Sequence, residues 1–212
     1  MQPRVKICGI TTAEQARWAA ESGTDAIGLV FHEPSTRAVG IQQAADIIAA
    51  IPAYVSVVGL FMNPDAAQVR TVLERLPLEM LQFHGEESAD FCRRFGRRYV
   101  KAVGMSGELD PVKASQLYPD AAALLVDSHA GRRAGGTGER FDWSRLPSRP
   151  DFDLVLAGGL APGNVAEAIR VVRPWAVDVS SGVESVPGQK DPQLMSRFIE
   201  EVQGVGQSKE SE

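Results

Sequence analysis

Four chemically active side chains come at the ends of short apolar runs or in the loops that follow them: Cys8, Arg37, His84 and Asp127. A thiolate at Cys8 could act as a base or a nucleophile. A carboxylic acid at Asp127 could donate a proton, provided that desolvation raises its pKa. Arg37 offers a planar fork that suits a carboxylate or a phosphate. These residue types suit proton transfer and anion binding.

Each of these side chains also has an ordinary structural role open to it. A lone cysteine is most often a small buried hydrophobe, and we expect Cys92, on the apolar side of a helix, to be one. Asp127 could cap a helix or form a turn, and Asp178 is a rival carboxylate. His84 is the best placed of the three histidines to line a pocket, although a structural role is equally open. The histidines are too scattered in the sequence for a metal site, so no metal is expected.

Two glycine-bearing turns near the C-terminus predict a phosphate site. Gly158 and Gly159 follow the seventh apolar run, and Ser181 and Gly182 follow the eighth. Glycines let backbone N–H groups approach an anion without a Cβ in the way, and helix N-termini favour negative charge. Barrels usually bind phosphate at the loops after strands seven and eight. The alternative is that both are ordinary tight turns.

Eight apolar runs of strand length must position these residues. The runs are Val5–Cys8, Ala26–Phe31, Val55–Phe61, Glu79–Phe83, Tyr99–Val103, Ala123–Val126, Leu154–Ala157 and Ala176–Val179. They recur about every 24 residues, which is the size of a strand with its crossover helix. Such alternation predicts an α/β fold with a parallel sheet, either open and doubly wound or closed as a (β/α)₈ TIM barrel. Eight even units, and no Gly-x-Gly-x-x-Gly after the first strand, favour the barrel.

Helical patterns lie between these runs, with Thr12 and Asp65 as expected N-caps. The pattern is poor between Val103 and Ala123, so we expect a short or missing fifth helix. The sequence predicts one domain over residues 1–203, followed by a disordered polar tail over 204–212.

Composition excludes several classes of protein. The chain has 212 residues, 44% hydrophobic and 23% charged, which is typical of a globular domain. A net charge of −5 provides no basic field for nucleic acid. Two cysteines exclude a disulfide framework and favour a reducing, cytoplasmic setting. The N-terminus lacks the apolar region of a signal peptide, and the most apolar stretch is too short to span a bilayer. We therefore expect a soluble protein with no membrane partner.

Several motifs together resemble the phosphoribosylanthranilate isomerases of tryptophan biosynthesis. They are Lys6-Ile7-Cys8-Gly9-Ile10-Thr11, Gln82-Phe83-His84-Gly85, Leu125-Val126-Asp127, Gly135-Gly136-Thr137-Gly138 with Phe141-Asp142-Trp143, Ala157-Gly158-Gly159-Leu160, Asp178-Val179-Ser180-Ser181-Gly182-Val183-Glu184 and Pro187-Gly188 with Lys190-Asp191. They cover nearly the whole chain in order. The visible departure is the arginine-bearing stretch Gly131-Arg132-Arg133.

The resemblance implies a TIM barrel that catalyses an Amadori rearrangement of N-(5-phosphoribosyl)anthranilate without a cofactor. The product is 1-(2-carboxyphenylamino)-1-deoxyribulose 5-phosphate. It implies Asp127 as general acid, Cys8 as general base, and Arg37 as the partner of the anthranilate carboxylate. The strand-seven and strand-eight loops would hold the phosphate. The family includes both monomers and homodimers.

Two other functions remain open from sequence. A related isomerase of histidine biosynthesis performs the same rearrangement with a carboxylate where Cys8 stands, so Cys8 argues against it, although the chain could carry both activities. A catalytically inactive barrel that binds a phosphorylated ligand is disfavoured by the presence of both Cys8 and Asp127.

Two structural expectations follow from the barrel. The glycine-rich segment 129–140 is expected to be a mobile lid. Side chains alternate along a strand, so Lys6 shares a face with Cys8, and Asp178 shares one with Ser180. Closure of the barrel makes strands one and eight neighbours. We therefore expect a buried Lys6–Asp178 ion pair that lowers the pKa of the Cys8 thiol.

Overall fold

The computed structural model of the chain describes residues 2–105, 110–127, 142–147 and 150–207. Eight parallel strands form a closed barrel in sequence order, with β1 paired to both β2 and β8. They are β1 (Arg4–Cys8), β2 (Ala26–Val30), β3 (Ser56–Phe61), β4 (Met80–Phe83), β5 (Arg98–Gly104), β6 (Ala123–Asp127), β7 (Leu154–Leu156) and β8 (Ala176–Val179). Each strand lies at one of the eight predicted runs, and the predicted (β/α)₈ barrel is confirmed.

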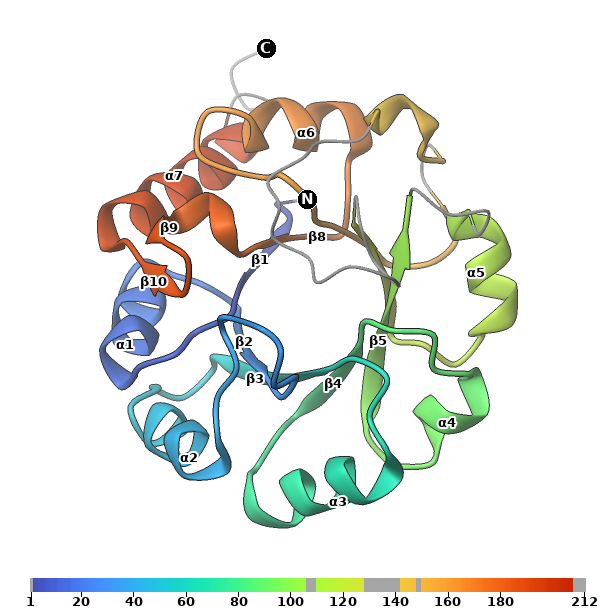
Figure 1. Ribbon diagram of the computed structural model, residues 1–212. Coiled ribbons are helices and arrows are strands. Elements are labelled where there is room, and N and C mark those ends of the chain that lie inside the picture. Colours follow the sequence, from blue (N-terminus) through green and yellow to red (C-terminus); the bar gives the residue numbers. More distant parts are fainter. Residues whose placement is uncertain (1, 106–109, 128–141, 148–149, 208–212) are drawn as a thin grey trace.

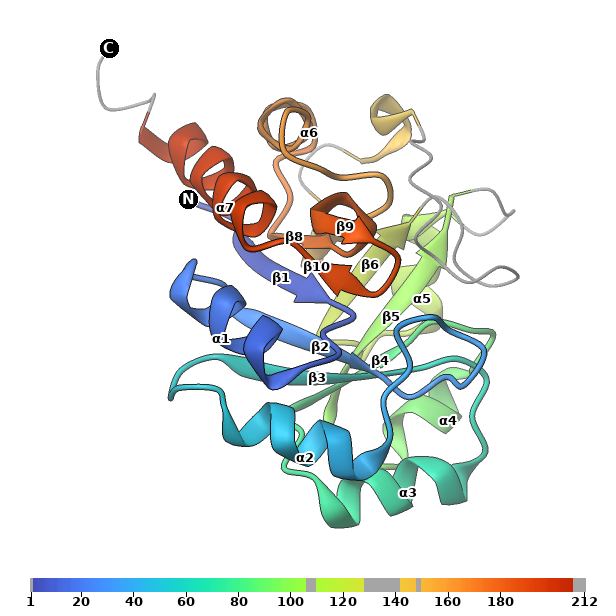
Figure 2. The same cartoon turned by 60° about the vertical axis from the view of Figure 1, so that its left-hand side comes forward.

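Helices surround the barrel (Figure 1). They are α1 (Ala13–Glu21), α2 (Ile41–Ala49), α3 (Ala66–Arg75), α4 (Ala89–Arg93), α5 (Pro111–Leu117), α6 (Val165–Val172) and α7 (Pro192–Gln207). The side chain of Thr12 accepts from the backbone N–H of Gln15, and that of Asp65 from Gln68, so both predicted N-caps are confirmed. Figure 2 shows α7 lying beside α1 and α6, which joins the two ends of the chain.

Three connections depart from a regular strand–helix unit. The helix after β5, α5, has seven residues and begins with Pro111, in agreement with the expected short fifth helix. Between β6 and β7 the described residues contain one 3₁₀ turn, η1 (Trp143–Arg145), and the expected lid over 129–140 lies outside the described residues. After β8, a 3₁₀ turn, η2 (Ser181–Val183), leads into a small hairpin of β9 (Glu184–Val186) and β10 (Gln189–Lys190).

The expected boundary between domain and tail is wrong by several residues. Helix α7 continues to Gln207, so residues 204–207 of the expected tail are helical. Val205 packs against the core, which favours continued helix at this point. Residues 208–212 lie outside the described part of the chain.

Side-chain alternation divides each strand between two cores. The larger core lies between the strands and the surrounding helices, and it includes Ile7, Ile27, Leu81 and Val177. The barrel interior is filled by a second cluster of small and aliphatic side chains, Val100, Ala102, Ala123, Leu125, Val155, Ala157 and Ala176, with Met80 packed against it. The interior-facing positions at the carboxyl ends of the strands are therefore the ones available to line a pocket.

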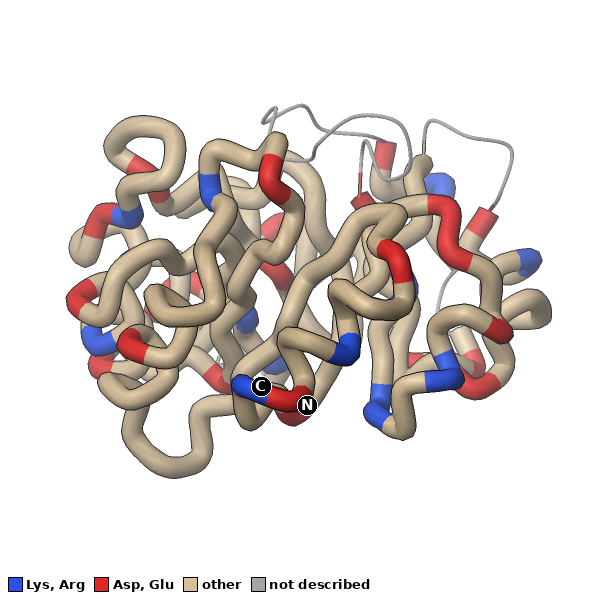
Figure 3. Tube along the Cα trace, turned by 60° about the horizontal axis from the view of Figure 1, so that its bottom comes forward, with Lys and Arg blue, Asp and Glu red and all other residues tan. Residues whose placement is uncertain are grey.

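The outer surface carries charges of both signs. Figure 3 shows lysine and arginine positions interspersed with aspartate and glutamate positions. Within the described residues, no helix is long and apolar enough to cross a membrane.

Candidate active site

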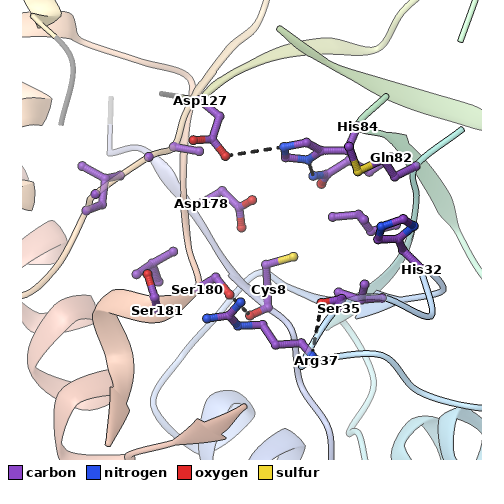
Figure 4. Close-up of a pocket in the computed structure, with 18 residues that line it drawn as sticks. Cys8, His32, Ser35, Arg37, Gln82, His84, Asp127, Asp178, Ser180 and Ser181 are labelled. Carbon is purple, nitrogen blue, oxygen red and sulfur yellow. Dashed lines mark hydrogen bonds and ion pairs between the residues drawn. The ribbon is translucent and has the colours of Figure 1, made fainter. Parts of the chain in front are cut away.

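A pocket opens at the carboxyl ends of the barrel strands, with an empty volume of about 760 Å³ that includes its open mouth. The residues that line it come from the ends of seven of the eight strands and from the loops that follow them (Figure 4). They are Cys8, Val30, His32, Ser35, Arg37, Leu60, Met62, Gln82, His84, Asp127, Ala157, Gly158, Gly159, Leu160, Asp178, Val179, Ser180 and Ser181. Seven of the eight predicted site residues are among them, and Gly182 is the exception.

Cys8 lies at the end of β1 with its sulfur directed into the pocket, and it is 6% exposed. Its neighbour across the β1–β2 ladder is Gly28. A Cβ added to Gly28 would lie 2.7 Å from the Cys8 sulfur and 3.2 Å from Cε of Lys6. The missing side chain of Gly28 is therefore what leaves room for the thiol and for the lysine stem below it.

Lys6 and Asp178 form the expected buried pair beneath Cys8. They are register partners on β1 and β8, and Lys6 Nζ lies 2.9 Å from Asp178 Oδ1. Burial alone would lower the pKa of Lys6, but the Asp178 carboxylate and the nearby thiol outweigh it and raise that pKa. The ammonium therefore stays charged below the pocket.

The charge of Lys6 acts on Cys8 in the expected direction, but the expected net fall in the pKa of the thiol does not occur. Burial raises the pKa of the Cys8 thiol, and it outweighs the opposing attraction of the Lys6 and Lys190 charges. Asp178 adds to the rise, because its negative charge partly cancels that of Lys6. The loss of water around the thiol therefore has a larger effect on its pKa than the charge of Lys6, which Asp178 offsets only in part.

Asp127 ends β6 and lines the same pocket as Cys8. Oδ2 of Asp127 lies 3.5 Å from Nε2 of His84, and Nδ1 of His84 lies 3.2 Å from the side-chain amide nitrogen of Gln82. Figure 4 shows this row of side chains along one wall. An amide donor at Nδ1 places the ring proton on Nε2, which then faces the Asp127 carboxylate.

Arg37 reaches the pocket from the loop after β2, and its guanidinium is already engaged on one edge. Nε and Nη2 donate to the two carboxylate oxygens of Glu184, each at 2.7 Å. This fork raises the pKa of Arg37 further above its ordinary value. Glu184 also accepts from Lys190 Nζ at 2.7 Å, and Lys190 donates in turn to the Ser180 carbonyl at 3.0 Å. Arg37, Glu184 and Lys190 are called the rim cluster below.

The two glycine-bearing turns lie side by side at the pocket mouth. Gly158 and Gly159 have φ of 79° and 66°, a conformation that glycine adopts without strain. A Cβ added to Gly182 would overlap the carbonyl oxygen of Leu160, so the η2 turn packs directly on the turn after β7. Gly182 therefore has a packing role between the loops, and Ser181 and Gly159 line the pocket itself.

Sequence reasoning missed three residues of this site. Gln82 is buried, and its Oε1 has no hydrogen-bond partner among the described residues although it lines the pocket. Glu184 and Lys190 lie within the motifs of the family resemblance, but nothing local indicated that Glu184 joins Lys190 to Arg37, which is 147 residues away from Glu184. Within the described part of the chain, no group of three or more His, Cys, Asp or Glu side chains is arranged to hold a metal ion.

Known proteins resemble this chain over nearly its full length. The family model described as N-(5'-phosphoribosyl)anthranilate (PRA) isomerase matches residues 5–201. The N-(5'-phosphoribosyl)anthranilate isomerase of Halorhodospira halophila is 53% identical over 203 residues, covering 96% of this chain and 98% of the relative. That of Acidithiobacillus ferrooxidans is 51% identical over 204 residues, covering 95% and 98%.

Solved structures agree. The phosphoribosyl anthranilate isomerase of Thermotoga maritima is 41% identical with a TM-score of 0.83, covering 95% of this chain and 99% of that one. Another phosphoribosyl anthranilate isomerase, 40% identical with a TM-score of 0.80 over the same shares, was solved in complex with reduced 1-(o-carboxyphenylamino)-1-deoxyribulose 5-phosphate. The chain belongs to the N-(5'-phosphoribosyl)anthranilate isomerase family.

Proposed function

We propose that Cys8 and Asp127 perform the two proton transfers of the phosphoribosylanthranilate isomerisation that this chain catalyses. The observation that carries the assignment is that both side chains enter one pocket from separate strands, β1 and β6. A ribose bound between them would present different atoms to each group. An aldose–ketose rearrangement requires one acid and one base that act on different atoms of the same sugar.

The first step is ring opening by Asp127. The carboxylic acid gives its proton to the furanose ring oxygen, the C1′–O bond breaks, and the anthranilate nitrogen lone pair forms an iminium ion at C1′. His84, whose Nε2 faces Asp127 Oδ2 at 3.5 Å, holds the carboxyl toward the pocket. No other proton donor is required for this step.

The second step is proton removal by Cys8. The thiolate takes the proton from C2′, and the C2′–H electron pair forms a double bond between C1′ and C2′ as the iminium nitrogen becomes neutral. The resulting enolamine gains a proton at C1′ and loses one from the C2′ hydroxyl, which gives the ketone. The iminium serves as the electron sink, so atoms and electrons balance without a cofactor. Each proton transfer group is typically worth about 10²- to 10⁴-fold in rate.

The two ends of the substrate are anions, and we assign each a site. The phosphate lies at the turns of Gly158, Gly159, Ser181 and Gly182, where backbone N–H groups and the start of α6 favour negative charge. Arg37 binds the anthranilate carboxylate, and His84 lines the pocket between the two sites. A relative binds a reduced product that carries both of these anionic groups.

The test is an assay that follows loss of substrate fluorescence with purified protein. We expect full activity in the parent chain and at least a 100-fold lower kcat in Asp127→Asn and in Cys8→Ala. Far-ultraviolet circular dichroism should show that both variants remain folded. Near-normal kcat in either variant would remove that residue from the mechanism, without affecting the isomerase assignment.

The setting of the enzyme is also a proposal. We propose a cytoplasmic enzyme, because its two thiols are unpaired and its substrate is a phosphorylated small molecule. A monomer or a homodimer is expected, and a relative from Thermotoga maritima is described as dimeric. Light scattering on the purified chain measures this directly.

A further inference from the structure

The rim cluster joins the loop after β2 to the hairpin after β8, and it contains a carboxylate that the mechanism does not use. We infer that Glu184 is a positioning residue that fixes Arg37 for the carboxylate of the substrate and thereby sets selectivity for carboxylate-bearing ligands. This inference rests on the proposed role of Arg37.

Glu184 holds Arg37 by the edge of its guanidinium. The bonds from Nε and Nη2 to the two carboxylate oxygens are both 2.7 Å long, and the side chains of Arg37 and Glu184 are 11% and 4% exposed. A bidentate fork fixes both the position and the plane of the guanidinium. The second edge of the Arg37 guanidinium, formed by Nη1 and Nη2, takes no part in the pairing with Glu184. That edge has the same two-donor geometry and matches a second carboxylate.

The stem of Arg37 is fixed as well. Gly9, with φ of 78°, follows Cys8, and a Cβ there would lie 2.5 Å from Cδ of Arg37. The side chain of Arg37 therefore packs directly against the backbone of Gly9, next to Cys8. Figure 4 shows Arg37 on the same side of the pocket as Cys8, Ser180 and Ser181.

Lys190 holds Glu184 from the other side. Its side chain is fully buried, with Nζ 2.7 Å from Glu184 Oε1 and 3.0 Å from the carbonyl oxygen of Ser180. The hydroxyl of Ser180 donates to the carbonyl oxygen of Cys8 at 3.0 Å. The carboxylate of Glu184 is therefore held, through Lys190 and Ser180, at the end of β1 that carries Cys8. Because Glu184 is held in place, its two hydrogen bonds also hold the guanidinium of Arg37 in place.

The charge of the rim cluster calls for one more anion. Arg37 and Lys190 contribute two positive charges, and Glu184 contributes one negative charge. Burial would raise the pKa of Glu184, but the hydrogen bond from Arg37 and the charge of Lys190 outweigh it and lower that pKa, so the carboxylate stays ionised. A largely desolvated group of charges with one cation in excess is stabilised by a bound anion. A benzoate-type carboxylate at the second edge of Arg37 balances the charge.

The experiment compares two ligands that differ only in this carboxylate. One is reduced 1-(o-carboxyphenylamino)-1-deoxyribulose 5-phosphate, and the other is its phenylamino counterpart, which keeps the sugar and phosphate. Calorimetry gives Kd for each ligand with the parent chain, Glu184→Gln, Arg37→Met and the double variant. Glu200→Gln, an exposed glutamate on α7, is the matched control.

We expect Glu184→Gln to weaken binding of the carboxylate ligand by about 10- to 100-fold and that of its counterpart by less than about threefold. We expect the double variant to bind the carboxylate ligand no more weakly than Arg37→Met, because Glu184 acts through Arg37. Equal losses for the two ligands, additive losses in the double variant, or tighter carboxylate binding in Glu184→Gln would each overturn the inference. Tighter binding would show that Glu184 competes with the ligand for Arg37.

The proposed role of Arg37 fails separately, if Arg37→Met shows no loss specific to the carboxylate ligand. Glu184→Asp keeps the charge and serves as the second variant if Glu184→Gln does not fold. It is expected to retain carboxylate binding better than a neutral residue, and equal loss in both ligands would again count against positioning.

Discussion

Lys6 and Asp178 close the barrel as a buried ion pair, with 2.9 Å between Nζ and Oδ1 at matched register positions of β1 and β8. The pair was predicted from strand parity and is confirmed. It lies directly below Cys8, where both residues are buried and each charge has the other as a hydrogen-bonded partner. The pair therefore contributes to the stability of the barrel as well as to the electrostatic surroundings of Cys8.

Removing one member of this pair should destabilise the fold. In Lys6→Met the Asp178 carboxylate is left buried without its partner, and such a break typically costs about 3–5 kcal/mol of unfolding free energy. Without Lys6 the pKa of Asp178 in the folded state rises, so at low pH the side chain is buried as the neutral carboxylic acid. The loss of unfolding free energy caused by Lys6→Met should therefore become smaller as the pH falls. Urea denaturation at several pH values measures it.

The double variant Lys6→Met/Asp178→Leu is the control for that prediction. Replacing both charges with apolar side chains removes the unpaired group, so we expect a smaller loss of stability than in Lys6→Met alone. A double variant that is as unstable as the sum of the single changes would contradict the pairing as the cause.

The residual activity of Asp127→Asn, in which the acid no longer titrates, should rise with pH through the neutral range. Burial raises the pKa of the Cys8 thiol, so most of the free enzyme carries the protonated form at neutral pH, and only the thiolate acts as the base. In this variant we expect kcat/KM to increase about tenfold per pH unit until the thiol pKa is reached. Steady-state rates measured under substrate-limiting conditions give this profile.

Alkylation checks the same group without turnover. Iodoacetamide should modify Cys8 faster as the pH rises, while Cys92, fully buried and with its pKa raised to about 12 by burial, stays unmodified as an internal control. An alkylation rate at Cys8 that does not change with pH would contradict a protonated thiol.

Gly28→Ala should lower kcat by displacing the Cys8 thiol, although Cys8 itself is unchanged. The added methyl group would lie 2.7 Å from the Cys8 sulfur, so the thiol or Lys6 must move. A displacement of this kind at a reacting group lowers kcat by about 10- to 100-fold. Gly204→Ala on α7 is the control, since its Cβ meets no atom within 4 Å. Unchanged kcat in Gly28→Ala would show that the strand end accommodates the methyl group.

Gly182→Ala should weaken the phosphate site. Its Cβ would overlap the carbonyl oxygen of Leu160, and the turns after β7 and β8 would be forced apart. We expect inorganic phosphate to inhibit the parent chain competitively and to inhibit Gly182→Ala at least about tenfold more weakly, because the N–H groups no longer converge. Equal inhibition constants in the two proteins would place the anion elsewhere.

The local pattern of residues was enough to predict much of this architecture. The β-strand period of two and the regular spacing of apolar runs are properties of short segments, so they predicted eight units and the inward direction of Lys6 and Asp178. The motifs around Cys8 and Asp127 placed both residues at strand ends. The sequence also indicated the short α5, because Pro111 is favoured at a helix start and the neighbouring glycines disfavour helix.

The tertiary structure alone decided which side chains from different loops touch and how burial changes the pKa of the groups in the pocket. Arg37 meets Glu184 across 147 residues, and this contact depends on how two loops fold over a closed barrel. The pKa of Cys8 rises where the charge of Lys6 alone predicted a fall, because burial outweighs the charge of Lys6, which Asp178 offsets in part. A pKa depends on the balance of desolvation and charge at three-dimensional distances, and neither quantity is carried by the order of residues along the chain.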